Sequence, residues 1–164
     1  MKSTIVIYGS TTGTCEAIAE KIASKLGCQS INVQELSADI VAAHQNLLIG
    51  TSTWGSGELQ DDWYDGLKTL QGADLKGKTV ALFGCGDSQS YGDTFVSGMG
   101  ELYNGIKDSG AHFIGSVATD SYSFDDSLAV VDGKFIGLPL DDINEADKTD
   151  ARIEAWLAQI TPEL

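Results

Sequence analysis

A loop of small hydroxyl residues follows the first apolar run of the chain: Gly9-Ser10-Thr11-Thr12-Gly13-Thr14-Cys15-Glu16. It lies between an expected strand and an expected helix, where the backbone N–H groups of the helix start attract anions and the hydroxyl groups add donors. The loop has no Lys or Arg and matches neither GxxxxGK nor GxGxxG, the patterns of nucleoside triphosphate and dinucleotide sites. Neutral donors favour one phosphate monoester held by residues 10–14, although an ordinary polar turn would have the same composition.

Two further loops carry an aromatic residue among glycines and polar residues. Trp54 precedes Gly55 in the loop Thr51-Ser52-Thr53-Trp54-Gly55-Ser56-Gly57-Glu58. Tyr91 lies in the loop Gly84-Cys85-Gly86-Asp87-Ser88-Gln89-Ser90-Tyr91-Gly92-Asp93. Each ring could fold onto the surface of its own domain or form a flat apolar wall for a ring system.

All three loops are expected at one edge of the molecule, because each leaves the carboxyl end of a parallel strand. A ligand for this edge needs a phosphate, a flat ring that two aromatic walls can enclose, and polar ring atoms within reach of the backbone. FMN (flavin mononucleotide) has these features, so the residues predict FMN as the cofactor.

The net charge of −14 restricts the partners. Nucleic acids and anionic membranes both attract basic surfaces, so neither is expected to bind. No basic residue occurs between Lys25 and Lys68 or between Lys78 and Lys107. These two gaps hold acidic residues throughout, namely Glu35, Asp39, Glu58, Asp61, Asp62, Asp65, Asp87, Asp93 and Glu101. A one-signed surface of this kind suits docking to basic partner proteins.

The cysteines and histidines give no sign of a disulfide framework or a metal site. Cys15, Cys28 and Cys85 are odd in number and lack CxxC spacing, and His44 and His112 lie far from them in sequence. The N-terminus runs directly into an apolar strand pattern without a cleavage signal, and no apolar run approaches the length of a membrane span. We therefore expect a cytoplasmic monomer.

Strand and helix patterns alternate along the chain. Strands are expected at 4–8, 30–33, 46–51, 79–83 and 113–117, and helices at 16–26, 37–43, 61–70, 95–106 and over the last apolar face that contains Trp156. This alternation predicts an α/β fold with three layers, in which a doubly wound, five-stranded parallel sheet is covered on both faces. Residues 1–164 form a single domain in this interpretation. A stretch rich in Asp, Ser and Gly, at about 118–140, is expected as an insertion at the fifth strand.

The tract Thr53-Trp54-Gly55-Ser56-Gly57-Glu58-Leu59-Gln60-Asp61-Asp62-Trp63, together with Phe83-Gly84-Cys85-Gly86-Asp87 and the later Tyr91, resembles the flavodoxin family over nearly the whole chain. The interrupted stretch before the last helix is similar to the insertion of the long-chain branch. The resemblance implies a flavodoxin-like fold, FMN bound without a covalent link, and a carrier of electrons rather than an enzyme. Its partners would be reductases and electron-accepting enzymes with basic surfaces.

Carried over by position, the resemblance implies roles for individual residues. Trp54 would stack on the inner face of the flavin and Tyr91 on the outer face, while the backbone at Gly55 faces the flavin N5. The candidate cofactor-binding residues are Ser10, Thr11, Thr12, Gly13, Thr14, Cys15, Thr51, Ser52, Thr53, Trp54, Gly55, Cys85, Gly86, Asp87 and Tyr91. Cys15 departs from the family, which usually has Thr or Ser there, and a thiol is a weak donor.

The redox behaviour follows from the backbone and the charges. A peptide carbonyl at 54–56 that turns toward N5 would stabilise the semiquinone, since glycine tolerates a positive φ. Nearby carboxylates and the phosphate would disfavour the anionic hydroquinone and lower the second potential. The expected protein is a low-potential carrier that cycles between these two states.

Two other functions fit the same architecture less well. A phospho-accepting receiver domain needs an acidic pair after the first strand and an Asp after the third, where this chain has Gly9-Ser10 and residues 50–53 without acids. An FMN-dependent quinone or nitro-group reductase needs an open ring face, which Tyr91 would cover, and a catalytic acid or base. A flavodoxin-like protein that serves one biosynthetic partner stays open as a third alternative.

Overall fold

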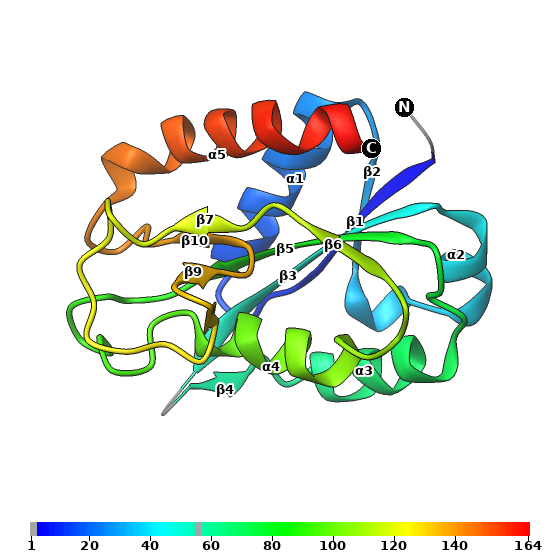
Figure 1. The fold of residues 1–164 in the computed structure, drawn as a ribbon, viewed down its shortest axis with the longest axis horizontal. Coiled ribbons are helices and arrows are strands. Elements are labelled where there is room, and N and C mark those ends of the chain that lie inside the picture. The colour runs from blue at the N-terminus through cyan, green and yellow to red at the C-terminus, as the bar shows by residue number, and fades with distance from the viewer. Residues whose placement is uncertain (1–2, 55–56) are drawn as a thin grey trace.

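The central sheet determines where the three loops meet. The computed structural model describes residues 3–54 and 57–164. Parallel strands pair in the order β2 (Gln29–Asn32), β1 (Thr4–Gly9), β3 (Asn46–Trp54) and β5 (Thr79–Cys85), and both β6 (His112–Ile114) and β10 (Leu138–Leu140) pair with β5. The predicted α/β fold with a parallel sheet is confirmed, and Figure 1 shows the strands crossing the middle of the molecule.

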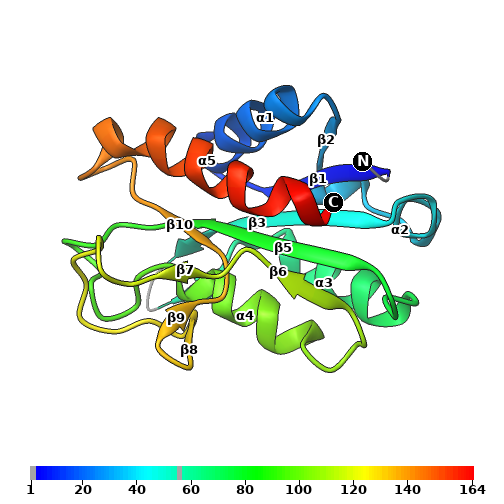
Figure 2. The ribbon, with the colours of Figure 1, turned by 45° about the horizontal axis from the view of Figure 1, so that its top comes forward.

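Helices cover both faces of this sheet, as Figure 2 shows. One face carries α1 (Thr14–Leu26) and α5 (Ala146–Ile160), and the other carries α3 (Trp63–Gly72) and α4 (Ser97–Ile106). The short helix α2 (Ala38–Ala43) joins β2 to β3, and two 3₁₀ turns span Val33–Glu35 and Thr161–Glu163. Within residues 3–54 and 57–164, no helix is long and apolar enough to cross a membrane.

Side chains alternate along the buried strands and so build two cores. On β1, Ile5 and Ile7 face the α3 and α4 side, whereas Val6 and Tyr8 face the α1 and α5 side. Such near-continuous apolar runs are typical of parallel strands that are buried on both faces. The cores fix the strand ends, and with them the loops that follow.

The fifth strand is divided into two short strands. β6 pairs with residues 79–81 of β5, and β10 pairs with residues 83–85. The predicted strand at 113–117 is therefore wrong at its end, because Gly115 has a φ of 87° and turns the chain out of the sheet after Ile114. Val117 belongs instead to a small antiparallel sheet of β7 (Val117–Ala118), β9 (Lys134–Phe135) and β8 (Val130–Val131).

The second loop is shorter than expected. The strand expected at 46–51 continues through residues 52–54, which were expected in the loop, and β4 (Glu58–Leu59) pairs back with Thr53 and Trp54 in an antiparallel arrangement. The β-branched residues Thr51 and Thr53 suit this extended backbone. The following helix begins at Trp63, two residues later than expected.

Candidate functional site

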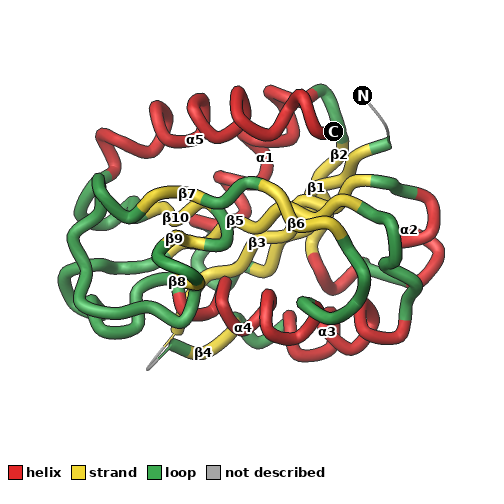
Figure 3. The backbone as a smooth tube through the Cα atoms, in the orientation of Figure 1, coloured by secondary structure: helices red, strands yellow, loops and turns green. Residues whose placement is uncertain are grey.

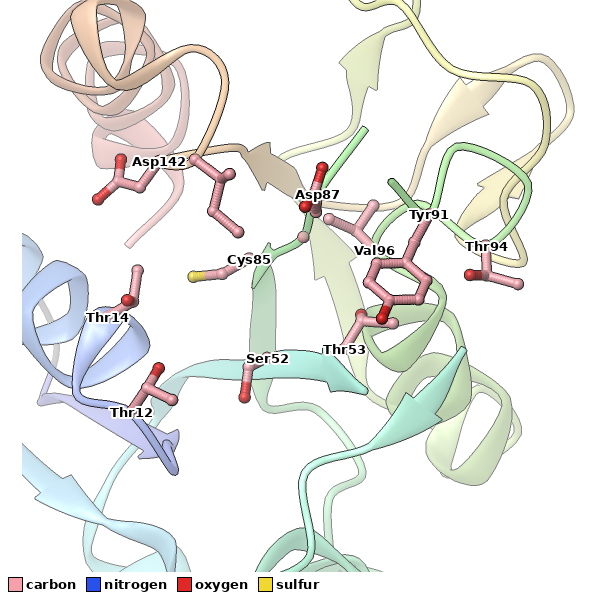
Figure 4. A pocket seen from close by; sticks show the side chains of 12 residues that line it. Thr12, Thr14, Ser52, Thr53, Cys85, Asp87, Tyr91, Thr94, Val96 and Asp142 are labelled. Carbon is pink, nitrogen blue, oxygen red and sulfur yellow. The ribbon is translucent and has the colours of Figure 1, made fainter. Parts of the chain in front are cut away.

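A cavity opens at the carboxyl ends of the central strands, where the doubly wound fold places ligands. Figure 3 shows long loops gathered at this end of the sheet, away from the two termini. The cavity is lined by Thr12, Thr14, Ser52, Thr53, Cys85, Gly86, Asp87, Tyr91, Thr94, Val96, Asp142 and Ile143. Figure 4 shows the threonines at the start of α1 across the cavity from Tyr91, with Ser52 and Thr53 on β3 between them.

The first loop is shaped as an anion site. Gly13 occupies the N-cap position of α1 with a φ of 92° and has no side chain, so the N–H groups of the first turn are left for an external acceptor. The Gly13 N–H itself is held by the hydroxyl of Ser10 at 3.1 Å, which closes the turn. Thr12 and Thr14 line the cavity beside this helix start.

Gln60 joins the first loop to the second. Its Nε2 donates to the Thr11 hydroxyl at 3.2 Å, and its Oε1 accepts the N–H of Asp62 at 3.0 Å. Its own N–H lies 3.4 Å from the hydroxyl of the fully buried Thr51. Gln60 therefore connects the first loop, through Thr11, to the end of β3, through Thr51.

The third loop is fixed by the carboxylate of Asp87. This group accepts the backbone N–H groups of Gln89 and Ser90 at 3.1 and 2.9 Å and the side-chain amide of Asn144 at 2.8 Å. Hydrogen bonding from Ser90 above all lowers the pKa of Asp87, so an anion borders the cavity at neutral pH. Tyr91, four residues further on, keeps 52% of its surface exposed.

A second carboxylate, that of the fully buried Asp141, directly precedes the lining residue Asp142. Asp141 accepts hydrogen bonds from Ser88, Ile143 and Asn144. Burial by itself would raise the pKa of Asp141, but the hydrogen bonds from Ser88 and Asn144 outweigh it and the pKa is lowered. Asp141 thereby joins the third loop to the segment before α5, and each of these two segments lines the cavity as a wall of its own.

Eight of the predicted residues line this one cavity: Thr12, Thr14, Ser52, Thr53, Cys85, Gly86, Asp87 and Tyr91. Ser10, Thr11, Gly13, Cys15 and Thr51 lie outside the lining set. The side chain of Trp54 and the whole of Gly55 lie outside the described residues, so their predicted roles stay predictions.

The sequence reasoning missed four lining residues, namely Thr94, Val96, Asp142 and Ile143. Asp142 and Ile143 follow β10, so the rule that ligands bind beyond strand ends would have found them if that strand had been recognised. Ile143 is 72% exposed despite its apolar side chain. Val96 has a φ of 47°, which a β-branched residue rarely adopts, and no sequence pattern announces it.

The donor set fits a phosphate monoester with an attached ring. Among the described lining residues, hydroxyl groups predominate, two are carboxylates and none is cationic. The Thr94 hydroxyl is buried and has no hydrogen-bond partner within the described part of the chain, so it is available to a ligand. Fold and site together define a doubly wound α/β protein with a ligand cavity beyond its strand ends.

The comparisons with known proteins specify the family. The sequence model of the flavodoxin family matches residues 6–156. Flavodoxin 1 of Azotobacter vinelandii is 48% identical over 165 aligned residues that cover 96% of this chain and 95% of that protein, and a Nostoc flavodoxin is 40% identical with the same coverage. The crystal structure of Fusobacterium nucleatum flavodoxin bound to flavin mononucleotide superposes with a TM-score of 0.93 at 32% identity, covering 100% of this chain and 99% of that one. The chain belongs to the flavodoxin family.

Proposed function

We propose that this flavodoxin binds FMN in the cavity between α1, β5 and Tyr91 and carries electrons one at a time between redox proteins. The observation that supports this most directly is a cavity that joins the N-terminus of a 13-residue helix to a half-exposed aromatic ring. No cation is among its described lining residues. Bound FMN supplies the redox chemistry, because its ring takes up and releases single electrons. The protein supplies position and charge.

In this proposal the loop at 10–14 holds the phosphate. The hydroxyl groups of Thr12 and Thr14 and the first-turn N–H groups of α1 face the anion. Tyr91 covers the outer ring face and Trp54 the inner one, while the backbone at Gly55 contacts the ring edge. Cys85, Gly86 and Asp87 border the pyrimidine end and the ribityl chain.

Charge sets the working potential in the same proposal. Asp87 and Asp142 both line the cavity, and Asp87 is held as an anion by its hydrogen bonds. One such charge about 10 Å from the ring, at an effective dielectric constant of about 20, disfavours a further negative charge by roughly 1.7 kcal/mol before salt screening. The carrier therefore works between its one-electron-reduced and fully reduced states, at low potential.

We propose that the partners are reductases and electron-accepting enzymes with basic surfaces. In this proposal the protein itself is a monomer and acts in the cytoplasm. The net charge of −14 and the exposed carboxylates of Glu58, Asp61 and Asp65 support electrostatic docking. Free Cys15, Cys28 and Cys85 are consistent with a reducing compartment.

Reductive titration of the FMN-loaded protein with dithionite tests the function. The expected result is an accumulating one-electron-reduced flavin, followed by bleaching at a potential well below that of free FMN. Thr12→Val should weaken FMN binding about tenfold or more, because it removes a hydrogen bond to a charged group worth about 1.5–3 kcal/mol. Thr119→Val, which alters a residue outside the cavity lining, is the matched control. A protein that takes up no FMN would refute the proposal.

A further inference from the structure

Gln60 is a buried polar residue in contact with the first loop. It lies between β4 and α3, is 2% exposed, and is outside the lining set of the cavity. Its side-chain Nε2 donates to the Thr11 hydroxyl at 3.2 Å and to a carboxylate oxygen of Asp62 at 2.9 Å. Its Oε1 accepts the backbone N–H of Asp62 at 3.0 Å. Both ends of the amide therefore have partners, which hold the buried side chain in one orientation.

These partners determine which end of the amide is nitrogen. A backbone N–H can only donate and a carboxylate accepts, so the Gln60 oxygen faces the N–H of Asp62 and the nitrogen faces its carboxylate. The second hydrogen of this nitrogen points to Thr11, whose hydroxyl oxygen is therefore the acceptor. The contact between Gln60 and Thr11 thus has a defined direction, from the amide to the loop.

Asp62 is held in turn by a second amide. Its other carboxylate oxygen accepts the side-chain N–H of Gln34 at 2.9 Å, and Gln34 belongs to the 3₁₀ turn Val33–Glu35 that follows β2. A chain of hydrogen bonds therefore runs from Gln34 through Asp62 and Gln60 to Thr11. It connects the end of β2 to the first loop, which follows the neighbouring strand β1.

The last residue of β1 also packs against Gln60. A Cβ atom at Gly9 would lie 2.5 Å from Oε1 of Gln60 and 2.5 Å from the ring of Trp63. Trp63 is fully buried and its indole N–H donates to the Gly50 carbonyl at 2.7 Å, so this ring is fixed as well. Only a residue without a side chain allows β1 to approach Gln60 this closely.

The first loop therefore has two sides. Gly9 and Thr11 contact Gln60, whereas Thr12 and Thr14 line the cavity. A loop that the protein already holds on one side loses less conformational freedom when a ligand binds to the other. The contacts of Gln60 are thus placed to fix the shape of the loop before an anion arrives.

We propose that Gln60 is a positioning residue for the cofactor phosphate, because through Thr11 it holds the first loop in the conformation that receives this group. The inference rests on the proposed function, since the phosphate is that of FMN. Gln60 acts through the loop and contacts no part of the flavin ring. Its effect should therefore appear in the binding of the phosphate and not in the binding of the ring.

Two flavins separate these contributions. FMN carries the phosphate and riboflavin lacks it, so the ratio of their dissociation constants reports on the phosphate subsite. Gln60→Met keeps the length of the side chain and removes the amide. It should weaken FMN binding about fivefold, the factor for one ordinary hydrogen bond, and change riboflavin binding by less than about twofold. Quenching of flavin fluorescence on titration of the FMN-free chain gives both constants.

Gln45→Met is the matched control. The side-chain amide of Gln45 also donates to the protein, to the Gly77 carbonyl at 2.7 Å. Gln45 directly precedes β3, however, and so lies at the amino ends of the strands, whereas the cavity lies beyond their carboxyl ends. This variant should change neither dissociation constant by more than about twofold.

Thr11→Val tests the same contact from the loop, and it decides the question if Gln60→Met does not fold. It should weaken FMN binding relative to riboflavin binding at least as much as Gln60→Met does. The double variant should weaken FMN binding no further than Thr11→Val alone, because both changes remove the same hydrogen bond.

Three results would overturn the inference. They are equal weakening of both flavins by Gln60→Met, an unchanged ratio in either single variant, and additive effects in the double variant. A natural chain that takes up neither flavin would instead refute the proposed function, and the inference with it.

Discussion

Asp141 accepts two hydrogen bonds from Ser88, one from the backbone N–H at 3.0 Å and one from the hydroxyl at 2.5 Å. Ser88 belongs to the loop that carries Tyr91, whereas Asp141 directly follows β10. The same carboxylate accepts the backbone N–H groups of Ile143 and Asn144. One buried side chain thus sets the distance between two walls of the cavity.

Replacing this carboxylate should loosen both walls. Asp141→Asn places an amide where donors converge and removes the charge from several hydrogen bonds. We expect a loss of about 2–3 kcal/mol in the free energy of unfolding, as for hydrogen bonds to charged groups. Urea unfolding of the FMN-free chain measures it. The control Asp120→Asn, at an exposed position, should change the free energy of unfolding by no more than about 0.5 kcal/mol. A loss there equal to that of Asp141→Asn would indicate that the change in net charge, and not the lost hydrogen bonds, causes the effect.

The stabilisation by Asp141 should depend on pH in a defined direction. Its pKa is lowered in the folded chain, against an ordinary unfolded value of about 3.9. The stabilising effect is therefore complete above about pH 4 and is lost as the pH falls through the lower folded pKa. The difference in unfolding free energy between the natural chain and Asp141→Asn should narrow between pH 5 and pH 2. A difference that is constant over this range would contradict the account.

Local patterns were sufficient to predict most strands of the parallel sheet and three of the loops at their carboxyl ends. Apolar runs and helical spacing located β1, β3, β5 and their helices, because these elements bury alternate side chains in two cores. The split of the fifth strand was not predictable in this way. It depends on a positive φ at Gly115 and on β10 pairing with β5 after a separate small sheet.

Pairing between segments that are distant in sequence also explains which site residues were missed. Thr12, Thr14 and Tyr91 belong to loops whose composition indicates a ligand, whereas Asp142 and Ile143 line the cavity only because β10 returns to the sheet. The support that Gln60 and Asp141 give to the loops comes from tertiary hydrogen bonds. No spacing in the sequence reports those contacts.

Gly137 allows the chain to return to the sheet. A Cβ atom at this position would lie 2.2 Å from the carbonyl oxygen of Leu82, a backbone atom that cannot rotate away. Gly137→Ala should therefore cost at least about 1–3 kcal/mol, the usual range for overpacking, and disturb β10. Gly72→Ala is the control, since among the described residues no atom beyond its own helix lies within 4 Å of that Cβ. Thermal unfolding should separate the two variants, and equal midpoints would exclude the proposed close approach.

Substitutions of Tyr91 and Tyr64 distinguish an effect on FMN binding from an effect on the stability of the fold. Their exposed fractions are nearly equal, 52% and 50%, but only Tyr91 lines the cavity. Tyr91→Ala and Tyr64→Ala should each change the free energy of unfolding of the FMN-free chain by no more than about 0.5 kcal/mol.

FMN binding should distinguish the two variants. Loss of a stacked ring costs about 0.5–1.5 kcal/mol beyond the buried area, so Tyr91→Ala should weaken FMN binding by at least about threefold to tenfold. Tyr91→Phe keeps the flat ring and should retain most of the affinity, and Tyr64→Ala should retain all of it. Quenching of flavin fluorescence on binding gives the dissociation constants. If Tyr64→Ala weakened binding as much as Tyr91→Ala, the ring would have to lie on the α3 surface instead of in this cavity.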